Sequence, residues 1–236
     1  MVPKTRHFCS LYFYAAVLNS TLLDWIYKLL FEAIAIRGGY IEFREYLKYL
    51  PLRTVELRTD KRTRLSLLKQ AEALYTGCAV ANDASGMLAF AAEQLAVKPE
   101  RADVVHDLLA FLAEQMMTLN RDKRAAANQF FTDLKDFHSI DARALNPKTK
   151  LDEFWKLDTD EVFAHLNKNR KALAAAKLDL NEAAENKIRS RFEQSKSAIL
   201  PLEAQIGFTD ELIDQMVYRL YSLTPEEIKI VEDSAK

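Results

Sequence analysis

The sequence predicts a mainly α-helical protein, with a small α/β element at the N-terminus and then a helical region that contains an antiparallel helix pair. Only five glycines and six prolines occur in 236 residues, so long stretches lack the residues that interrupt helices. Apolar residues recur at helical spacing through most of the chain. One short stretch, residues 40–43, has the aromatic and β-branched character of a strand instead.

The N-terminal element begins with residues 15–36, whose apolar positions follow one face of a helix. Gly38 and Gly39 are expected to end this helix, because glycine tolerates the left-handed conformation of a C-terminal cap. Residues 40–43 form the expected strand. Residues 45–51 then predict one or two helical turns that Pro51 stops.

Two further helices are expected before residue 100. The first runs from Asp60 to Thr76 and is ended by Gly77, and its inner side is expected to carry Leu65, Leu68, Ala71 and Leu74 or Tyr75. The second covers about residues 82–96.

Two heptad seams follow, which are rows of apolar residues at alternating spacings of three and four. The first consists of Val105, Leu109, Leu112, Met116 and Leu119, and the second of Ile188, Phe192, Ser195, Ile199, Leu202 and Ile206. Two such seams separated by about 60 residues predict an antiparallel helix pair. Pro201 lies inside the second seam, where it is expected to kink or split the helix.

The C-terminus carries strong helix signals. A helix is expected to begin after Thr209, with Leu212, Ile213, Met216, Val217 and Leu220 on one face. Thr224 and Glu227 form a capping box, and Leu223 and Ile228 are placed as its hydrophobic staple. We assign residues 1–58 to one domain and residues 59–236 to a helical scaffold whose arm spans about residues 100–206.

The composition is that of a globular, cytoplasmic protein. The formal net charge is −1, but residues 37–64 hold eight Lys/Arg against four Asp/Glu and residues 201–236 hold three against eight. Cys9 and Cys78 are too few for a disulfide framework and fit a reducing compartment. No span reaches the roughly 20 apolar residues of a membrane helix.

The sequence predicts no catalytic residue, metal site or cofactor. Adenine methylation needs an Asn/Asp-Pro-Pro-aromatic tetrad and a glycine-rich loop, and Asn146-Pro147-Lys148 does not substitute for the tetrad. The histidines, His7, His106, His138 and His165, are scattered and are expected to be surface residues or hydrogen-bonded core residues. Asp179, Glu185 and Lys187 imitate the spacing of a Mg²⁺ nuclease, but their segment has a helical pattern.

The stretch from Arg37 to Lys48 is the candidate for DNA contact. Its cations can neutralise phosphates, and a Gly-Gly turn lets the main chain approach a sugar-phosphate edge. The residues concerned are Arg37, Gly38, Gly39, Tyr40, Arg44 and Lys48. A basic, half-exposed hairpin with no ligand explains the same pattern equally well.

Two blocks of sequence resemble a known family. One joins Leu18-Asn19-Ser20, Arg37-Gly38-Gly39-Tyr40 and the segment Leu47–Leu52, and the other is "IDQMVYRLYSLTPEEIKIVE", residues 213–232, with "KTKLDEFWKL" as a weaker companion. They resemble, in the same order, the end of the target-recognition region and the closing signature of type IIG restriction-modification enzymes and related adenine-specific methyltransferases. That family shares a Taq-like C-terminal specificity domain.

The resemblance implies a non-catalytic DNA-recognition fragment that positions double-stranded DNA for a catalytic partner, a separately encoded methyltransferase or endonuclease chain. The catalytic domains of the family would lie before Met1, so the chain alone is expected to be inert. Apolar helix faces without those neighbours would favour self-association.

Two other functions stay open. The chain could be a helical protein–protein interaction module with no DNA role, whose seams bind another helix. It could also be a Mg²⁺ nuclease built around Asp179, Glu185 and Lys187.

Overall fold

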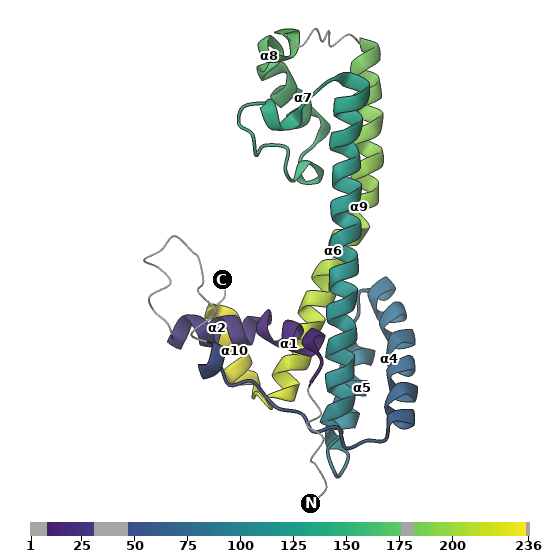
Figure 1. Ribbon diagram of the computed structural model, residues 1–236, viewed down its shortest axis with the longest axis vertical. Coiled ribbons are helices and arrows are strands. Elements are labelled where there is room, and N and C mark those ends of the chain that lie inside the picture. The colour runs from purple at the N-terminus through teal and green to yellow at the C-terminus, as the bar shows by residue number, and fades with distance from the viewer. Residues whose placement is uncertain (1–8, 31–46, 176–181, 235–236) are drawn as a thin grey trace, which may run out of the picture. The chain divides into compact units, whose positions relative to one another are not determined.

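The computed structural model describes residues 9–30, 47–175 and 182–234. In these residues the chain is helical and contains no strand (Figure 1), so the prediction of a mainly α-helical fold is confirmed. The strand expected at residues 40–43, and the Gly38-Gly39 helix end before it, lie outside the described residues.

The chain divides into two compact units. Unit 1 combines residues 1–117 with 207–236, and unit 2 is residues 118–206. The division falls within two long helices, α6 (Ala102–His138) and α9 (Glu182–Leu220), each of which contributes to both units. The compact units therefore do not separate at residue 58, where the sequence suggested a domain boundary.

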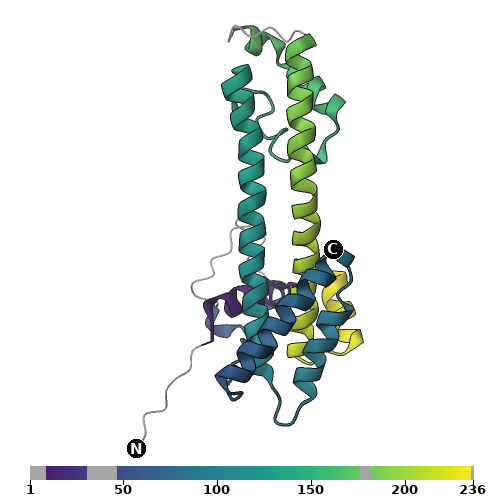
Figure 2. The same ribbon diagram turned by 90° about the vertical axis from the view of Figure 1, so that its right-hand side faces the viewer.

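Unit 1 is a cluster of short helices packed on the first part of α6 and the last part of α9. It contains α1 (Leu11–Leu18), α2 (Thr21–Leu30), the 3₁₀ turn η2 (Leu47–Tyr49), α4 (Lys61–Ala81), α5 (Ser85–Ala96) and α10 (Pro225–Ser234). Helices α4 and α5 pack against each other (Figure 2). Its largest fully buried side chains include Phe13, Leu23, Met87, Leu108, Leu109, Leu112 and Tyr218.

The helix expected over residues 15–36 is wrong in its start and its continuity. Helix α1 already begins at Leu11, because the Ser10 side chain caps it by accepting from the Tyr12 amide. The chain then breaks at Asn19 and Ser20. There the Asn19 side chain donates to the Ala15 carbonyl and the Ser20 hydroxyl donates to that of Val17. Short polar side chains that bond to the main chain in this way compete with helix continuation.

Gly77 does not end α4, contrary to expectation. The helix continues to Ala81 and ends at Asn82, whose φ of 52° supplies the left-handed cap. Cys78 and Ala79, beyond the glycine, pack against the core of unit 1. This burial offsets the roughly 1 kcal/mol that a glycine costs inside a helix. Ala71 and Tyr75 are buried as predicted, whereas Leu65 and Leu74 are exposed.

Unit 2 is built on an antiparallel pair formed by the end of α6 and the start of α9, so the expected antiparallel helix pair is present. The two seams lie in different cores, however, because Val105, Leu109 and Leu112 are buried in unit 1 and Ile188, Phe192 and Ile199 in unit 2. Lys123 lies 3.6 Å from Glu203, and Asp133, further along α6, lies 3.6 Å from Arg191, further back on α9. The connecting segment contains η3 (Ala142–Ala144), η4 (Phe154–Lys156), α7 (Thr159–Lys168) and α8 (Arg170–Ala175) beside this pair (Figure 1). Its core includes Phe130, Leu134, Ile140, Phe154, Leu166, Ile188, Phe192 and Ile199.

Helix α9 is one helix where the sequence suggested two. Pro201 does not split it, and Thr209 lies within it and not before its start. Proline removes the amide that would donate to the Ser197 carbonyl, but Ser197 and Pro201 are both exposed, so water can satisfy that carbonyl. Ile199 and Phe208, on either side of Pro201, are buried in units 2 and 1 respectively.

The C-terminal signals are confirmed. The Thr224 amide donates to the Glu227 carboxylate at 2.8 Å, and the Glu227 amide donates to the Thr224 hydroxyl at 3.3 Å, which completes the capping box. Leu223 and Ile228 pack against the core of unit 1. None of the described helices is long and apolar enough to cross a lipid bilayer.

Candidate nucleic-acid interface

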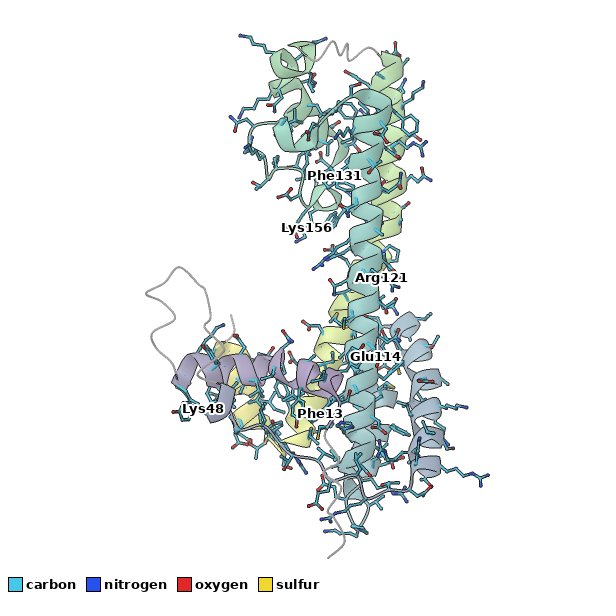
Figure 3. The ribbon with its side chains drawn as sticks, viewed as in Figure 1. Phe13, Lys48, Glu114, Arg121, Phe131 and Lys156 are labelled. Atoms are coloured by element: carbon cyan, nitrogen blue, oxygen red, sulfur yellow. The ribbon has the colours of Figure 1, made fainter. Side chains whose placement is uncertain are left out.

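Lys48 is the one predicted DNA-contact residue that the structure describes. It lies on η2 and is exposed, and its ammonium group is 4.9 Å from the centroid of the neighbouring Tyr49 ring. Figure 3 shows Lys48 at the edge of unit 1, whereas Phe13 lies among packed helices. The other five, Arg37, Gly38, Gly39, Tyr40 and Arg44, lie outside the described residues.

Helix α2 precedes residues 31–46, and its first residue, Thr21, is bound to the last part of α9. The Thr21 amide donates to Asp214 Oδ1 at 2.8 Å, and the Thr21 hydroxyl donates to Asp214 Oδ2. Burial raises the pKa of Asp214, the two Thr21 hydrogen bonds oppose this rise, and the Glu211 charge adds to it. Helix α2 also packs against α10. Helix α2 is therefore fixed to the C-terminal helices.

The segment that follows residues 31–46 is held by Tyr221, the residue directly after α9. The Tyr221 hydroxyl accepts from the Arg53 amide at 3.0 Å and donates to the Pro51 carbonyl at 2.9 Å. Burial raises the pKa of Tyr221, against the opposing hydrogen bond from Arg53. Both flanks of residues 31–46 thus rest on one base, which is formed by the end of α9 and the residues after it.

A second set of hydrogen bonds fixes the basic segment, residues 37–64, to the start of α6 at Arg58 and Thr59. Asp103 is 1% exposed, and its carboxylate accepts from the amides of Arg58 and Thr59 and from the Thr59 hydroxyl, at 2.9, 2.6 and 2.8 Å. A buried carboxylate that is bonded three times is well satisfied. The main chain at residues 58–59 is therefore held against α6.

His106 is a hydrogen-bonded core residue, as expected for the scattered histidines. Its Nε2 accepts from the Ser10 amide at 2.9 Å, so Nδ1 carries the proton and donates to Asp107 at 2.9 Å. Asp107 also receives two hydrogen bonds from the Arg64 guanidinium. Burial would raise the pKa of Asp107, but the hydrogen bonds from His106 and Arg64 and the Arg64 charge outweigh it, and the net shift is downward.

The first two turns of α4 present a cationic surface. Lys61, Arg62 and Lys69 line a hollow of about 500 Å³ together with Leu65 and Ser66. The first turn of α4 contains no acidic residue, although the positive end of the helix dipole favours acidic residues there. The N-cap residue Asp60 supplies negative charge at this end of the helix, and its carboxylate accepts from the Thr63 amide at 3.0 Å.

No metal site of the kind a nuclease needs is found among the described residues. In this part of the chain no three His, Cys, Asp or Glu side chains come together. Glu185 and Lys187 lie on α9, which agrees with the helical pattern of their segment, and Asp179 lies outside the described residues.

The contacts that sequence reasoning missed are those between distant segments. Thr21 and Asp214 are 193 residues apart, and Pro51 and Tyr221 are 170 apart. Asp214 and Tyr221 belong to the block at residues 213–232, and Pro51 belongs to the segment Leu47–Leu52 of the other block. The signal was present in each block, but nothing local indicated that the two meet.

Comparisons with known proteins add one match. A family model described as a domain of unknown function, DUF8810, matches residues 104–217, which run from the first turn of α6 to the last turn of α9. No curated protein and no solved structure matches the chain.

Proposed function

We propose that this chain is a non-catalytic DNA-recognition component of a restriction-modification adenine methyltransferase system. In this proposal it holds double-stranded DNA in position for a catalytic chain that carries the methyltransferase or nuclease groups. The basic segment beginning at Arg37 supplies the contact surface, and unit 1 supplies the base on which that segment is mounted.

The observation that carries the proposal is the direct bonding between the two sequence blocks that resemble the family. Thr21, which follows Leu18-Asn19-Ser20 of the first block, binds Asp214 of the closing signature, and Pro51 binds Tyr221 of the same signature. Two motifs that occur together because they share one architecture should be in contact, and these are.

Charge supports the same assignment. The segment 37–64 carries a surplus of four positive charges, and its described cations include the exposed Lys48 and the α4 residues Lys61 and Arg62. Positive side chains on a fixed main chain can neutralise phosphates without a large loss of conformational freedom. An anchored, cationic segment is what non-catalytic DNA positioning requires.

The test is equilibrium binding of duplex DNA over a range of salt concentrations, measured by fluorescence anisotropy with and without the co-expressed catalytic chain. We expect log K to fall linearly with log salt, by about 0.9 for each phosphate that the protein neutralises. Lys48→Gln should weaken binding and reduce the slope by about 1.

Lys168→Gln is the matched control, because Lys168 is an exposed lysine at the end of α7 in unit 2. It should leave both affinity and slope unchanged. The proposal fails if the chain binds no duplex in either setting, or if its affinity is independent of salt.

A helical interaction module is the second candidate, and exposed leucines favour it. Leu11 is 83% exposed on α1, and Leu29 and Leu30 are 62% and 52% exposed on α2. The seam residues Leu109 and Leu112 are fully buried inside unit 1, so they are not available to bind an external helix. Leu29→Glu should therefore abolish self-association in sedimentation equilibrium if these leucines form a contact between copies, and should leave DNA affinity unchanged.

A further inference from the structure

Unit 2 contains a cleft of about 760 Å³ between the last turn of α6 and the first turns of α9. Its principal lining residues are Phe137, His138, Lys187, Ser190, Arg191 and Gln194. No described lining residue comes from residues 139–175, so the connecting segment with α7 and α8 does not fill it. A volume of this size lies in the range of small-ligand sites.

Among the described residues that line the cleft, Lys187 and Arg191 are cationic and none carries a carboxylate. Lys187 is exposed and forms no ion pair with any carboxylate in the described part of the chain. Arg191 lies 3.6 Å from Asp133 and also within hydrogen-bonding distance, 3.3 Å, of the Gln194 side chain. Burial and the charges of Lys187 and Arg191 lower the pKa of His138, and Asp133 opposes them. Both cations therefore act on the imidazole across the cleft.

The cleft also has an aromatic wall. Phe137 is 68% exposed, which is unusual for so large an apolar side chain. The Arg191 guanidinium lies 5.7 Å from the centroid of its ring. An aromatic ring beside a guanidinium offers a stacking surface for a flat, ring-containing ligand, and the neighbouring ammonium and hydroxyl groups of Lys187 and Ser190 suit an anion.

We propose that this cleft binds a nucleotide, with its phosphate held by Lys187, Arg191 and Ser190 and its base stacked on Phe137. The chemistry is the same for a free mononucleotide and for a nucleotide within a single strand. The site lies in unit 2 and uses none of the residues assigned to duplex binding, so the two proposals stand or fall separately.

The experiment measures binding of three probes to the full chain by isothermal titration calorimetry: inorganic phosphate, adenosine monophosphate and a single-stranded thymidine pentanucleotide. We expect saturable binding of the adenosine nucleotide or the pentanucleotide, and at least about tenfold weaker binding of inorganic phosphate, because one base–aromatic stack contributes about tenfold or more. Tighter binding of the pentanucleotide would identify a single strand as the source, and equal or weaker binding a free nucleotide.

Two variants and a control locate the site. Lys187→Gln should weaken nucleotide binding about tenfold, since it removes a charge-assisted hydrogen bond, and Phe137→Ala should bring nucleotide affinity down toward that of phosphate. Both side chains are exposed, so both variants should fold. Lys135→Gln, at an exposed lysine of α6 that does not line the cleft, should change nothing.

The imidazole of His138 gives a readout that does not depend on affinity. A bound phosphate stabilises the protonated ring, so the pKa of His138, followed by NMR and assigned with His138→Gln, should rise when the nucleotide is added. The NMR signals of the His106 ring, in unit 1, should not move. The proposal is overturned if neither nucleotide probe saturates, if phosphate binds as tightly as both, or if Lys187→Gln behaves like Lys135→Gln.

Discussion

Tyr221→Phe tests whether the closing block of the sequence holds the flank of the basic segment. The substitution removes one hydroxyl and keeps the ring. That hydroxyl bridges two main-chain groups of the segment after η2, because it accepts from the Arg53 amide and donates to the Pro51 carbonyl. The ring packs partly buried against the core of unit 1, so the phenylalanine should occupy the same space.

The expected loss follows from these two bonds. A hydrogen bond contributes about 0.5–1.5 kcal/mol net, and the bond to Pro51 is exposed, so water can replace part of it. We expect the free energy of unfolding to fall by about 1–2 kcal/mol. For a chain of this length that corresponds to a fall in Tm of about 2–8 °C.

The assay is thermal and urea unfolding followed by circular dichroism, together with duplex-DNA affinity at low salt. Tyr12→Phe is the matched control, because Tyr12 is a partly exposed tyrosine of α1 whose hydroxyl has no hydrogen bond within the described residues. It should unfold like the unsubstituted chain. DNA affinity should fall in Tyr221→Phe and not in Tyr12→Phe, since only the first releases a flank of the basic segment.

The reasoning is refuted if Tyr221→Phe unfolds within about 0.3 kcal/mol of its control, a threshold that matches the uncertainty expected for additive surface changes. Loss of stability with unchanged DNA affinity would leave the anchor in place as a structural feature and refute its link to DNA contact.

Three further changes probe the charges and cores of the two units. Burial, with the nearby Asp214 charge, raises the pKa of Tyr218 to about 12. As pH rises, the tyrosine therefore loses its proton in the unfolded chain first, and the free energy of unfolding should fall by about 2–3 kcal/mol between pH 10 and 12. Tyr218→Phe should flatten this loss in urea titrations. Burial and the Asp214 charge raise the pKa of Asp210, so the protonated form is favoured in the folded state and stability falls as pH rises through that raised pKa. Asp210→Asn should therefore add about 0.2–0.5 kcal/mol at pH 7, and the gain should vanish in acid where the carboxyl is protonated. The Phe130 ring is fully buried, and its centroid lies 4.1 Å from that of Phe154. Phe130→Ala should therefore lower the free energy of unfolding by about 3–5 kcal/mol, which should appear as faster hydrogen exchange in unit 2. Phe137→Ala, at an exposed ring, should not have this effect.

Local signals in the sequence identified much of the fold. The helical periods indicated the approximate places of α4, α5, α6 and α10, and the Thr224 capping box is present as predicted. These features depend on side chains within about four residues of one another, so the sequence carries them directly. The two seams predicted an antiparallel helix pair, because a heptad row of apolar residues needs a partner row, but most of the first seam is buried in unit 1 and the second seam is buried in unit 2.

Helix ends and breaks were harder to predict, because burial decides them. Gly77 and Pro201 are both interruption signals, yet α4 and α9 continue through them. The residues beyond each signal bury apolar surface, and this gain exceeds a local cost of about 1 kcal/mol for glycine and about 3 kcal/mol for proline. Conversely, Asn19 and Ser20 stop a helix that apolar spacing alone would continue.

The pattern of amino acids is thus enough to predict the helical character of the chain and the places of most of its helices. It took the packing of those helices to show that Asp214 and Tyr221 hold the two flanks of residues 31–46, and that Phe137, His138, Lys187 and Arg191 line one cleft. These contacts join residues that lie far apart along the chain, up to 193 positions for Thr21 and Asp214. They depend on how whole helices pack, and no pattern within a few residues encodes that packing.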